Sequence, residues 1–425
     1  MLISYVDRRT LISFAWFFFL LFGWYCARPV RESLATMVPE SQLKWVMSAT
    51  FALMLIVTPI YGWIARQLTR RTLYLMSYSI FLIAFSWFAW SLPTDAAQAE
   101  QSTLLIGCFY VWASFFSLFS VSCFWSFLVD VFTTGEAKVT FGRIAAGGTA
   151  GSILASLVAI NLSKQIGNRG LLMVTAGSLM ISAILVLLLD IVCEPARWTR
   201  TDVVRANSSW RDLFTAFRSL TTSPYLLGIA IFLFVGTAID IVLYFDVNSL
   251  MKGISDVHRR TSLFASFNLY SSIAIVAGQW LITPWCLRHL GITYILVGVP
   301  LVYAISFGTL GMFNTLAVAF SVGILIRVLW LSLVAPAREV LFTSVSREDK
   351  FATKNLIDTV FVRGGGVFPG FLIEPGKAWL GSMDRVLFAA IPFALLAAGL
   401  GAYLGRLHRQ SLHQSHDNSR GPSSP

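Results

Sequence analysis

Residues 170–189 read GLLMVTAGSLMISAILVLLL and contain no charged side chain. A helix of about 20 apolar residues is long enough to cross the hydrocarbon core of a bilayer. The run ends at Asp190, where the chain becomes polar. A stretch of this length and composition predicts a transmembrane helix.

The rest of the chain has the same character. Of its 425 residues, 56% are hydrophobic and 12% are charged, and the mean hydropathy is +0.71. Globular domains carry about 25% charged residues, so the charges here are too few to cover a water-facing surface. The composition excludes a soluble enzyme, a nucleic-acid-binding protein and a disordered scaffold. It predicts an all-α polytopic membrane protein, in which the net charge of +11 is loop charge that sets the topology.

Similar apolar runs predict twelve transmembrane helices in two groups of six. They lie at about 11–27, 45–65, 72–92, 103–129, 144–162 and 170–193, and then at 224–250, 262–287, 291–312, 314–336, 356–376 and 384–404. We expect an N-terminal half at 1–193, a cytoplasmic linker with an amphipathic helix at 194–223, a C-terminal half at 224–404 and a disordered cytoplasmic tail at 405–425. Because the first apolar run is short for a bilayer, its helix is expected to continue past Arg31.

The basic residues are divided unevenly between the two sides of these helices. Twenty Lys and Arg residues fall on the side of both termini and the linker, ten fall on the other side, and Arg327 and Arg363 lie inside predicted helices. Cytoplasmic loops carry the excess of Lys and Arg. Both termini are therefore expected in the cytoplasm.

The two halves also resemble each other. In the first half, Phe132-Thr133 and Glu136-Ala-Lys138 precede a glycine-rich helix. About 210 residues later, Phe342-Thr343 and Glu348-Asp-Lys350 precede Gly364 to Gly366. Two six-helix halves in parallel repeat are the layout of the major facilitator superfamily, whose substrate site lies between the halves. Residues 62–71 resemble that superfamily's loop between helices 2 and 3, without the usual acid.

Charged groups inside a span cost several kcal/mol, so each is a functional candidate. Arg28, Arg31 and Glu32 have the spacing of one helix face and could bind a phosphate or carboxylate. The alternative is that they mark the outer end of the first helix, with Glu32 pairing an arginine.

A second group of charged residues lies in the C-terminal half. Its members are Arg327, Arg338, Glu339, Asp358 and Arg363. Asp130, Asp240 and Asp358 are candidates for proton coupling. Structural pairing, such as Arg327 with Asp240, is the competing interpretation. The glycine-rich runs are expected to allow close helix packing, since no phosphate-binding loop motif occurs.

Three stretches resemble the ATP:ADP antiporter family, nucleotide transporters within the major facilitator superfamily. They are Tyr25 to Glu32, then Phe124-Trp-Ser-Phe-Leu-Val-Asp130 with a downstream Glu136-Ala-Lys, and finally Pro336-Ala-Arg338-Glu339 with Asp358 and the glycines beyond it. The resemblance implies phosphate binding by Arg31 and Arg338 and a transport role for Asp130. Both family lysines are arginine here and the family's glutamate is Asp130, so the chain resembles a divergent bacterial member.

The sequence therefore predicts a monomeric secondary transporter of the bacterial inner membrane, working by alternating access. Its expected partner is a small anionic phosphorylated solute, most specifically a nucleotide in exchange. No cofactor, metal, nucleic acid or enzymatic activity is expected. The alternatives are a proton-coupled transporter of a drug, peptide or metal chelate, and a non-transporting membrane sensor with the same fold.

Overall fold

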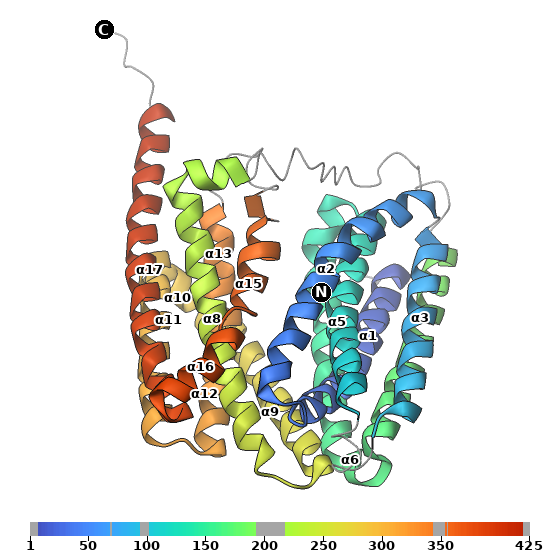
Figure 1. Ribbon diagram of the computed structural model, residues 1–425. Helices are drawn as coiled ribbons and strands as arrows, with labels where there is room; N and C mark the ends of the chain where they lie inside the picture. Colours follow the sequence, from blue (N-terminus) through green and yellow to red (C-terminus); the bar gives the residue numbers. More distant parts are fainter. Residues whose placement is uncertain are drawn as a thin grey trace. The chain divides into compact units, whose positions relative to one another are not determined.

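A computed structural model describes residues 7–68, 70–93, 102–192, 217–342, 353–354 and 356–419. Every regular element in these ranges is a helix (Figure 1). Nine of the described helices are long and apolar enough to cross a membrane. The described helices follow the twelve predicted runs in order, so the predicted fold class is confirmed.

The chain divides into two compact units. Unit 1 comprises residues 1–206 and 251–272, and unit 2 comprises residues 207–250 and 273–425. The change of unit at residue 251 means that the loop after the seventh helix packs with unit 1. Each unit is described separately below.

Unit 1 contains five long helices from the first part of the chain. They are α1 (Arg8–Ala35), α2 (Glu40–Gln67), α3 (Arg70–Ser91), α5 (Thr103–Val131) and α6 (Thr134–Val192). The helix α1 does continue past Arg31, with Pro29 inside it. Although α6 has 59 residues, Gly167 interrupts it with φ 65° and ψ −176°, a conformation that only glycine adopts readily. The break separates the fifth and sixth predicted spans.

The remaining helices, with several π-helical turns among them, lie in unit 2 except for residues 251–272, which belong to unit 1. They are α8 (Pro224–Lys252), α9 (Val257–Ala277), η2 (Gly278–Ile282), α10 (Thr283–His289), α11 (Gly291–Met312), α12 (Leu316–Leu329), η3 (Trp330–Val334), α13 (Ala335–Leu341), η5 (Ile357–Val362), α15 (Arg363–Gly365), α16 (Gly370–Leu380) and α17 (Met383–Ser419). The chain passes into unit 1 at Met251, near the end of α8, and returns to unit 2 at Ile273, within α9. Pro284 and Pro336 follow η2 and η3 within two residues, and proline lacks the N–H that an α-helical turn requires. The wider π turns accommodate that loss.

Aromatic side chains form the centre of unit 1. The Trp16 indole is fully buried and meets Tyr78 edge to face, and its Nε1–H donates to the Tyr78 hydroxyl over 2.9 Å. Phe124 and Phe127 of α5 pack against the same indole, with ring centroids 4.7 and 5.2 Å away. The indole N–H therefore has a partner even though it lies in an apolar core.

Glycines bring corresponding helices into contact in both units. A Cβ atom on Gly147 would lie 2.6 Å from the Phe14 carbonyl oxygen, and one on Gly151 would collide with the Phe18 carbonyl. In unit 2, a Cβ on Gly365 would collide with the Phe234 carbonyl. The fifth predicted span thus packs on the first, and the eleventh packs on the seventh, through small residues that allow close approach.

We expect Gly151→Ala to lower the melting temperature of the purified protein. The added methyl group must push α6 away from α1, and overpacking of this kind costs about 1–3 kcal/mol. Gly142 is a matched control on the same helix, because nothing lies within 4 Å of its added Cβ. Gly142→Ala should be neutral or stabilising, by up to about 1 kcal/mol. Equal melting temperatures for the two variants would contradict the close α1–α6 contact.

The end of the chain differs from the predicted disordered tail. The helix α17 continues to Ser419, beyond the predicted limit at residue 405. Leu404 and His408 are buried, and the His408 ring Nδ1 lies 3.2 Å from the Tyr225 hydroxyl of α8. Packing against α8 explains why the polar composition of this segment did not end the helix there. In the linker, residues 217–222 are helical, and residues 194–216 lie outside the described residues.

Candidate functional site

The first candidate cluster lies on the last two turns of α1. Arg31 donates from Nη1 to the Ser114 hydroxyl of α5 over 2.8 Å and also bonds Glu32 through Nη2. Arg28 forms a longer ion pair with the same carboxylate, with Nε 3.9 Å from Glu32 Oε1. The predicted shared face is therefore present, and both arginines meet one acid.

Aromatic rings flank these guanidinium groups. The Arg31 guanidinium carbon lies 5.2 Å from the Trp24 ring centre and 4.8 Å from that of Tyr110, and Arg28 lies 5.8 Å from Tyr25. Cations are attracted to aromatic faces at such distances. The rings restrict where the Arg31 head group can turn and exclude water from around it.

Burial and charge make this cluster distinctive. The side chains of Arg28, Arg31 and Glu32 are only 21%, 12% and 8% exposed. Two guanidinium groups face one carboxylate within this triad, so the triad itself carries a positive charge. A permanently charged guanidinium in a water-poor setting is suited to bidentate binding of phosphate or carboxylate.

The second cluster, in unit 2, is an alternating chain of charges. Arg338 donates from Nη1 to Asp358 Oδ1 over 2.8 Å and from Nη2 to Glu339 Oε1 over 3.0 Å. Glu339 in turn accepts from the Lys354 ammonium over 2.6 Å. Asp358 lies on the π turn η5, and Arg363 at the start of α15 is close enough to influence it electrostatically. Of the predicted second group, Arg338, Glu339 and Asp358 are brought together, with Lys354 added.

The two clusters differ in how deeply their charged side chains are buried. In the second cluster, Arg338 contacts two carboxylates, and those carboxylates are 48% and 36% exposed. In the first, two arginines share one carboxylate and are more deeply buried. The first cluster is therefore the stronger candidate for an anion, whereas Arg338 must give up an acid to accept one.

The other predicted site residues are on helices α12, α8 and α5. Arg327 is half-buried in the last turn of α12, next to Ile326, whose carbonyl accepts from the Tyr303 hydroxyl over 3.4 Å. Asp240 is on an exposed face of α8. Asp130 is in the last turn of α5, and its side chain lies outside the described residues. Pairing of Arg327 with Asp240 stays a prediction.

Sequence reasoning missed three neighbours of Arg31: Trp24, Tyr110 and Ser114. Only the packing of α1 against α5 brings Tyr110 and Ser114 to the guanidinium, and that packing is not visible in a sequence. The available signal for Ser114 was a polar residue within the apolar run of α5.

Glu136, quoted above only for its family resemblance, has a structural role. It forms a reciprocal cap with Thr133 at the start of α6: Glu136 Oε2 accepts from the Thr133 backbone N–H and hydroxyl, each over 2.9 Å. Arg9 of α1 donates to Glu136 Oε1 over 3.0 Å. The Thr133 backbone bond, and then the Arg9 bond, lower the pKa of Glu136 to about 2.

We expect Glu136→Gln to lower the free energy of unfolding by about 0.5–1 kcal/mol at neutral pH, as for other partly exposed ion pairs. Because folding lowers the pKa from 4.5 to about 2, this contribution is present above pH 4.5 and is lost as pH falls toward 2. Melting curves of the wild type and variant should therefore converge in acid. A difference that is constant with pH would contradict the ionised pair.

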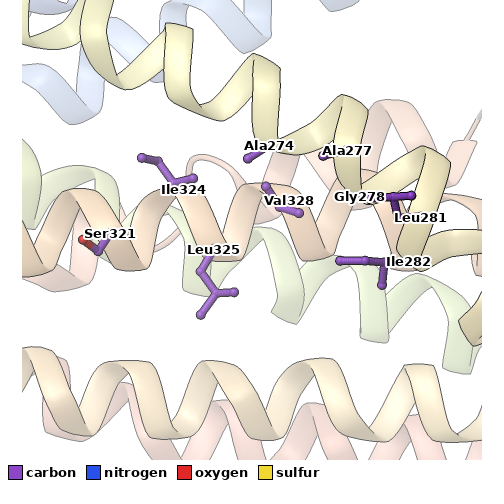
Figure 2. Close-up of a pocket in the computed structure, with 9 residues that line it drawn as sticks. All are labelled: Ala274, Ala277, Gly278, Leu281, Ile282, Ser321, Ile324, Leu325 and Val328. Carbon is purple, nitrogen blue, oxygen red and sulfur yellow. The ribbon is translucent and has the colours of Figure 1, made fainter.

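A separate pocket in unit 2 has different chemistry (Figure 2). Its lining is formed by Ala274, Ala277, Gly278, Leu281, Ile282, Ser321, Ile324, Leu325 and Val328, with a volume of about 370 Å³. The single hydroxyl in this lining, that of Ser321, donates to the Ala317 carbonyl over 2.8 Å. With no charged group in its lining, this pocket does not offer an anion site.

Comparison with known proteins identifies the family. A model of the Major Facilitator Superfamily matches residues 7–369, which is most of the chain and includes parts of both units. The chain belongs to the Major Facilitator Superfamily. Membership of this superfamily supports a role in transport across a membrane. No curated protein matches the chain.

Solved structures of other transporters share the fold. A bacterial homologue of the human lysosomal transporter Spinster is 14% identical, with a TM-score of 0.65, over 96% of this chain and 99% of that one. An auto-inhibited peptide transporter of the POT family is 14% identical, with a TM-score of 0.65 and coverage of 94% and 97%. A mutant of the nucleoside transporter NupG is 15% identical, with a TM-score of 0.64 and coverage of 95% and 98%.

Proposed function

We propose that this superfamily member transports a small anionic, phosphorylated solute by alternating access, and that its specific activity is nucleotide exchange. The observation that carries the proposal is the buried cluster of Arg28, Arg31 and Glu32 on α1, where two guanidinium groups share one carboxylate. Guanidinium groups in such a water-poor setting are suited to binding phosphate through charge-assisted, bidentate hydrogen bonds.

Arg31 is the residue expected to bind the phosphate first. Its guanidinium is held by Ser114 and flanked by Trp24 and Tyr110. An arriving phosphate would compete with Glu32 for the donors of Arg31, and Arg28 would remain paired with Glu32 across one helical turn. Substrate binding would thereby exchange one ion pair for another instead of adding a charge to an apolar region.

In unit 2, Arg338 is proposed to bind the anion at a different stage of transport. Asp358 and Glu339 hold Arg338 in the described state. Lys354 also binds Glu339, so this acid keeps a cationic partner when Arg338 turns away. Arg327 and Arg363 are proposed as further substrate contacts, and Asp130 as an acid that shapes the site.

Alternating access requires a segment that can change partners. Residues 251–272, which run from the end of α8 into α9, pack with unit 1, whereas residues 224–250 of α8 belong to unit 2. The Ser33 hydroxyl of α1 donates to the Val257 carbonyl over 3.1 Å, and Arg260 donates from Nη1 to the Thr36 hydroxyl over 2.7 Å. We infer that these bonds form and break during the transport cycle.

The remaining expectations are proposals of the same kind. We propose a monomer in a bacterial inner membrane with both termini in the cytoplasm, and two six-helix halves at 1–193 and 224–404 joined by a cytoplasmic linker. The distribution of Lys and Arg supports the orientation. Narrower membership in the ATP:ADP antiporter family rests on the three motif stretches quoted above.

A proton-coupled transporter of another solute is the second candidate. The acids Asp240 and Asp358 on membrane-spanning elements favour it. The similarity in fold to peptide and nucleoside transporters is compatible with it. In that case, a pH gradient would drive uptake of a solute that is not phosphorylated, and competing nucleotides would have no effect. A non-transporting sensor, the third candidate, would bind a ligand without any flux.

A ligand series tests the anion requirement. The purified protein should gain thermal stability with ATP, ADP or AMP and gain none with adenosine, since bound ligands stabilise the folded state and adenosine lacks the phosphate. Arg31→Lys, which keeps the charge but loses the planar fork, should reduce the shift. Equal shifts with adenosine and its phosphates would contradict the role of the arginines, as would no shift with any phosphorylated metabolite.

A further inference from the structure

A further group of polar side chains lies in unit 2 and shares no residue with either arginine cluster. Asp246 near the end of α8 is fully buried. Its Oδ1 accepts from the Asn314 side-chain Nδ2 over 3.0 Å, and the same Nδ2 donates to Asp384 Oδ1 over 2.8 Å. One amide group therefore holds two carboxyl groups from different helices.

The second oxygen of Asp246 is not satisfied. Among the described residues, no hydrogen-bond donor reaches the buried Oδ2 atom of Asp246. An ionised carboxylate at this site would have a single neutral donor and a second carboxylate beside that donor. Burying a charge with so little compensation costs several kcal/mol, whereas a protonated carboxyl is neutral.

The surrounding charges reinforce this conclusion. Asp384 repels a negative charge on Asp246, and Lys377 of α16 attracts it. Arg385 donates to the Leu380 carbonyl over 2.8 Å, and Lys252, further along α8, pairs with Glu40 over 3.7 Å. Asp240, earlier on α8, is exposed. No cation is hydrogen-bonded to Asp246 among the described residues.

Asp384 has the more favourable setting for a negative charge. It lies in the first turn of α17, where the backbone N–H groups of a helix stabilise an anion, and it is half-buried. Two carboxyl groups whose surroundings differ in this way can hold one proton between them, with the proton on the more buried partner. That partner is Asp246.

We propose that Asp246 is a proton-binding site of this transporter, which carries its proton on Oδ2 in the described state. On release, the O–H bond of Asp246 breaks and the proton passes to water. The two carboxylates then repel each other across Asn314. Because Asp246, Asn314 and Asp384 belong to α8, the turn before α12 and α17, release would loosen the contact among these three elements.

The ligand expected here is a proton and not a metal cation. The Asn314 amide presents its NH₂ group to Oδ1 of both carboxyl groups, and Oδ1 of Asp246 can accept this bond while the proton is on Oδ2. A cation between the carboxylates would require the amide oxygen to face it instead. Dependence on Na⁺ is therefore a result that would overturn the proposal.

Infrared difference spectroscopy of the purified protein, without substrate, tests proton binding directly. Between about pH 5 and pH 8, the wild type should lose the C=O band of a protonated carboxyl, and Asp246→Asn should lack that band. Asp384→Asn should keep it, and Asp246→Glu should move it. Two results would refute the proposal. One is the same band in Asp246→Asn. The other is stabilisation of the wild type by NaCl, at constant ionic strength, that is lost in Asp246→Asn. If Asp246→Asn does not fold, the band shift in Asp246→Glu decides.

A second measurement links the proton to transport, and this step alone rests on the proposed function. In proteoliposomes, Asp246→Asn should remove the effect of an imposed pH gradient on uptake, leaving exchange at equal pH. If uptake in the wild type does not respond to the gradient while the infrared band behaves as expected, proton coupling is wrong but the binding site stands. If no substrate is transported at all, the proposed function fails and the infrared result is unaffected.

Discussion

Arg31→Ala should reduce substrate uptake into proteoliposomes by roughly tenfold to a hundredfold, the loss expected for one charge-assisted bidentate contact of about 1.5–3 kcal/mol. The reason is the position of Arg31: its side chain is 12% exposed, bonded to Ser114 and Glu32, and flanked by two aromatic rings. The loss should appear as a raised Kd for the phosphorylated solute, measured by ligand-induced stabilisation.

A folding defect has to be separated from a binding defect, because Glu32 is buried and loses a partner in this variant. Arg31→Lys retains the charge and serves as the first control. The double variant Arg31→Ala with Glu32→Gln also removes the carboxylate charge that Arg31 pairs with, and should melt close to the wild type, yet still fail to bind. Wild-type uptake by Arg31→Ala would remove this residue from the site.

Cross-linking α1 to the start of α9 should stop transport. With the native cysteines replaced by serine, cysteines at Ser33 and Val257 are close enough to be joined by oxidation or a short thiol reagent, since Ser33 Oγ lies 3.1 Å from the Val257 carbonyl. We expect more than a tenfold loss of uptake on cross-linking and recovery on reduction, because the state that releases this contact becomes inaccessible.

The single-cysteine variants control for the substitutions and the reagent, and should keep their activity under the same treatment. Mass spectrometry of the joined peptides must establish the cross-link before the flux is interpreted. Full turnover by the cross-linked protein would show that residues 251–272 stay on α1 throughout transport, and it would contradict the inferred change of partners.

The length and order of the helices were predictable because hydrophobic runs must match the bilayer. The extension of α1 past Arg31 followed from the same reasoning, since the run from Leu11 was too short to span alone. The π turns η2 and η3 were not predictable: they depend on how the chain absorbs the missing donors of Pro284 and Pro336. The helical tail was missed because its contact with Tyr225 comes from tertiary packing.

For the candidate site, the sequence predicted only which residues of one helix share a face. The spacing of Arg28, Arg31 and Glu32 fixed their common face, and the structure pairs both arginines with that acid. Ser114 lies 83 residues from Arg31, and the ion pair between Arg338 and Asp358 joins residues 20 apart. Such contacts depend on which helix faces which. Asp246 falls within the predicted run 224–250, but its burial and its partner Asn314 required the structure.

Counterflow tests the central claim most directly. Proteoliposomes loaded with unlabelled ATP, ADP or another phosphorylated solute are diluted into a trace of the labelled compound, with equal pH on both sides. The account predicts that the labelled anion accumulates transiently inside, that loading with adenosine does not support this, and that Arg31→Ala abolishes it. Folded wild-type protein that gives no counterflow with any nucleotide or other phosphorylated solute would contradict the account.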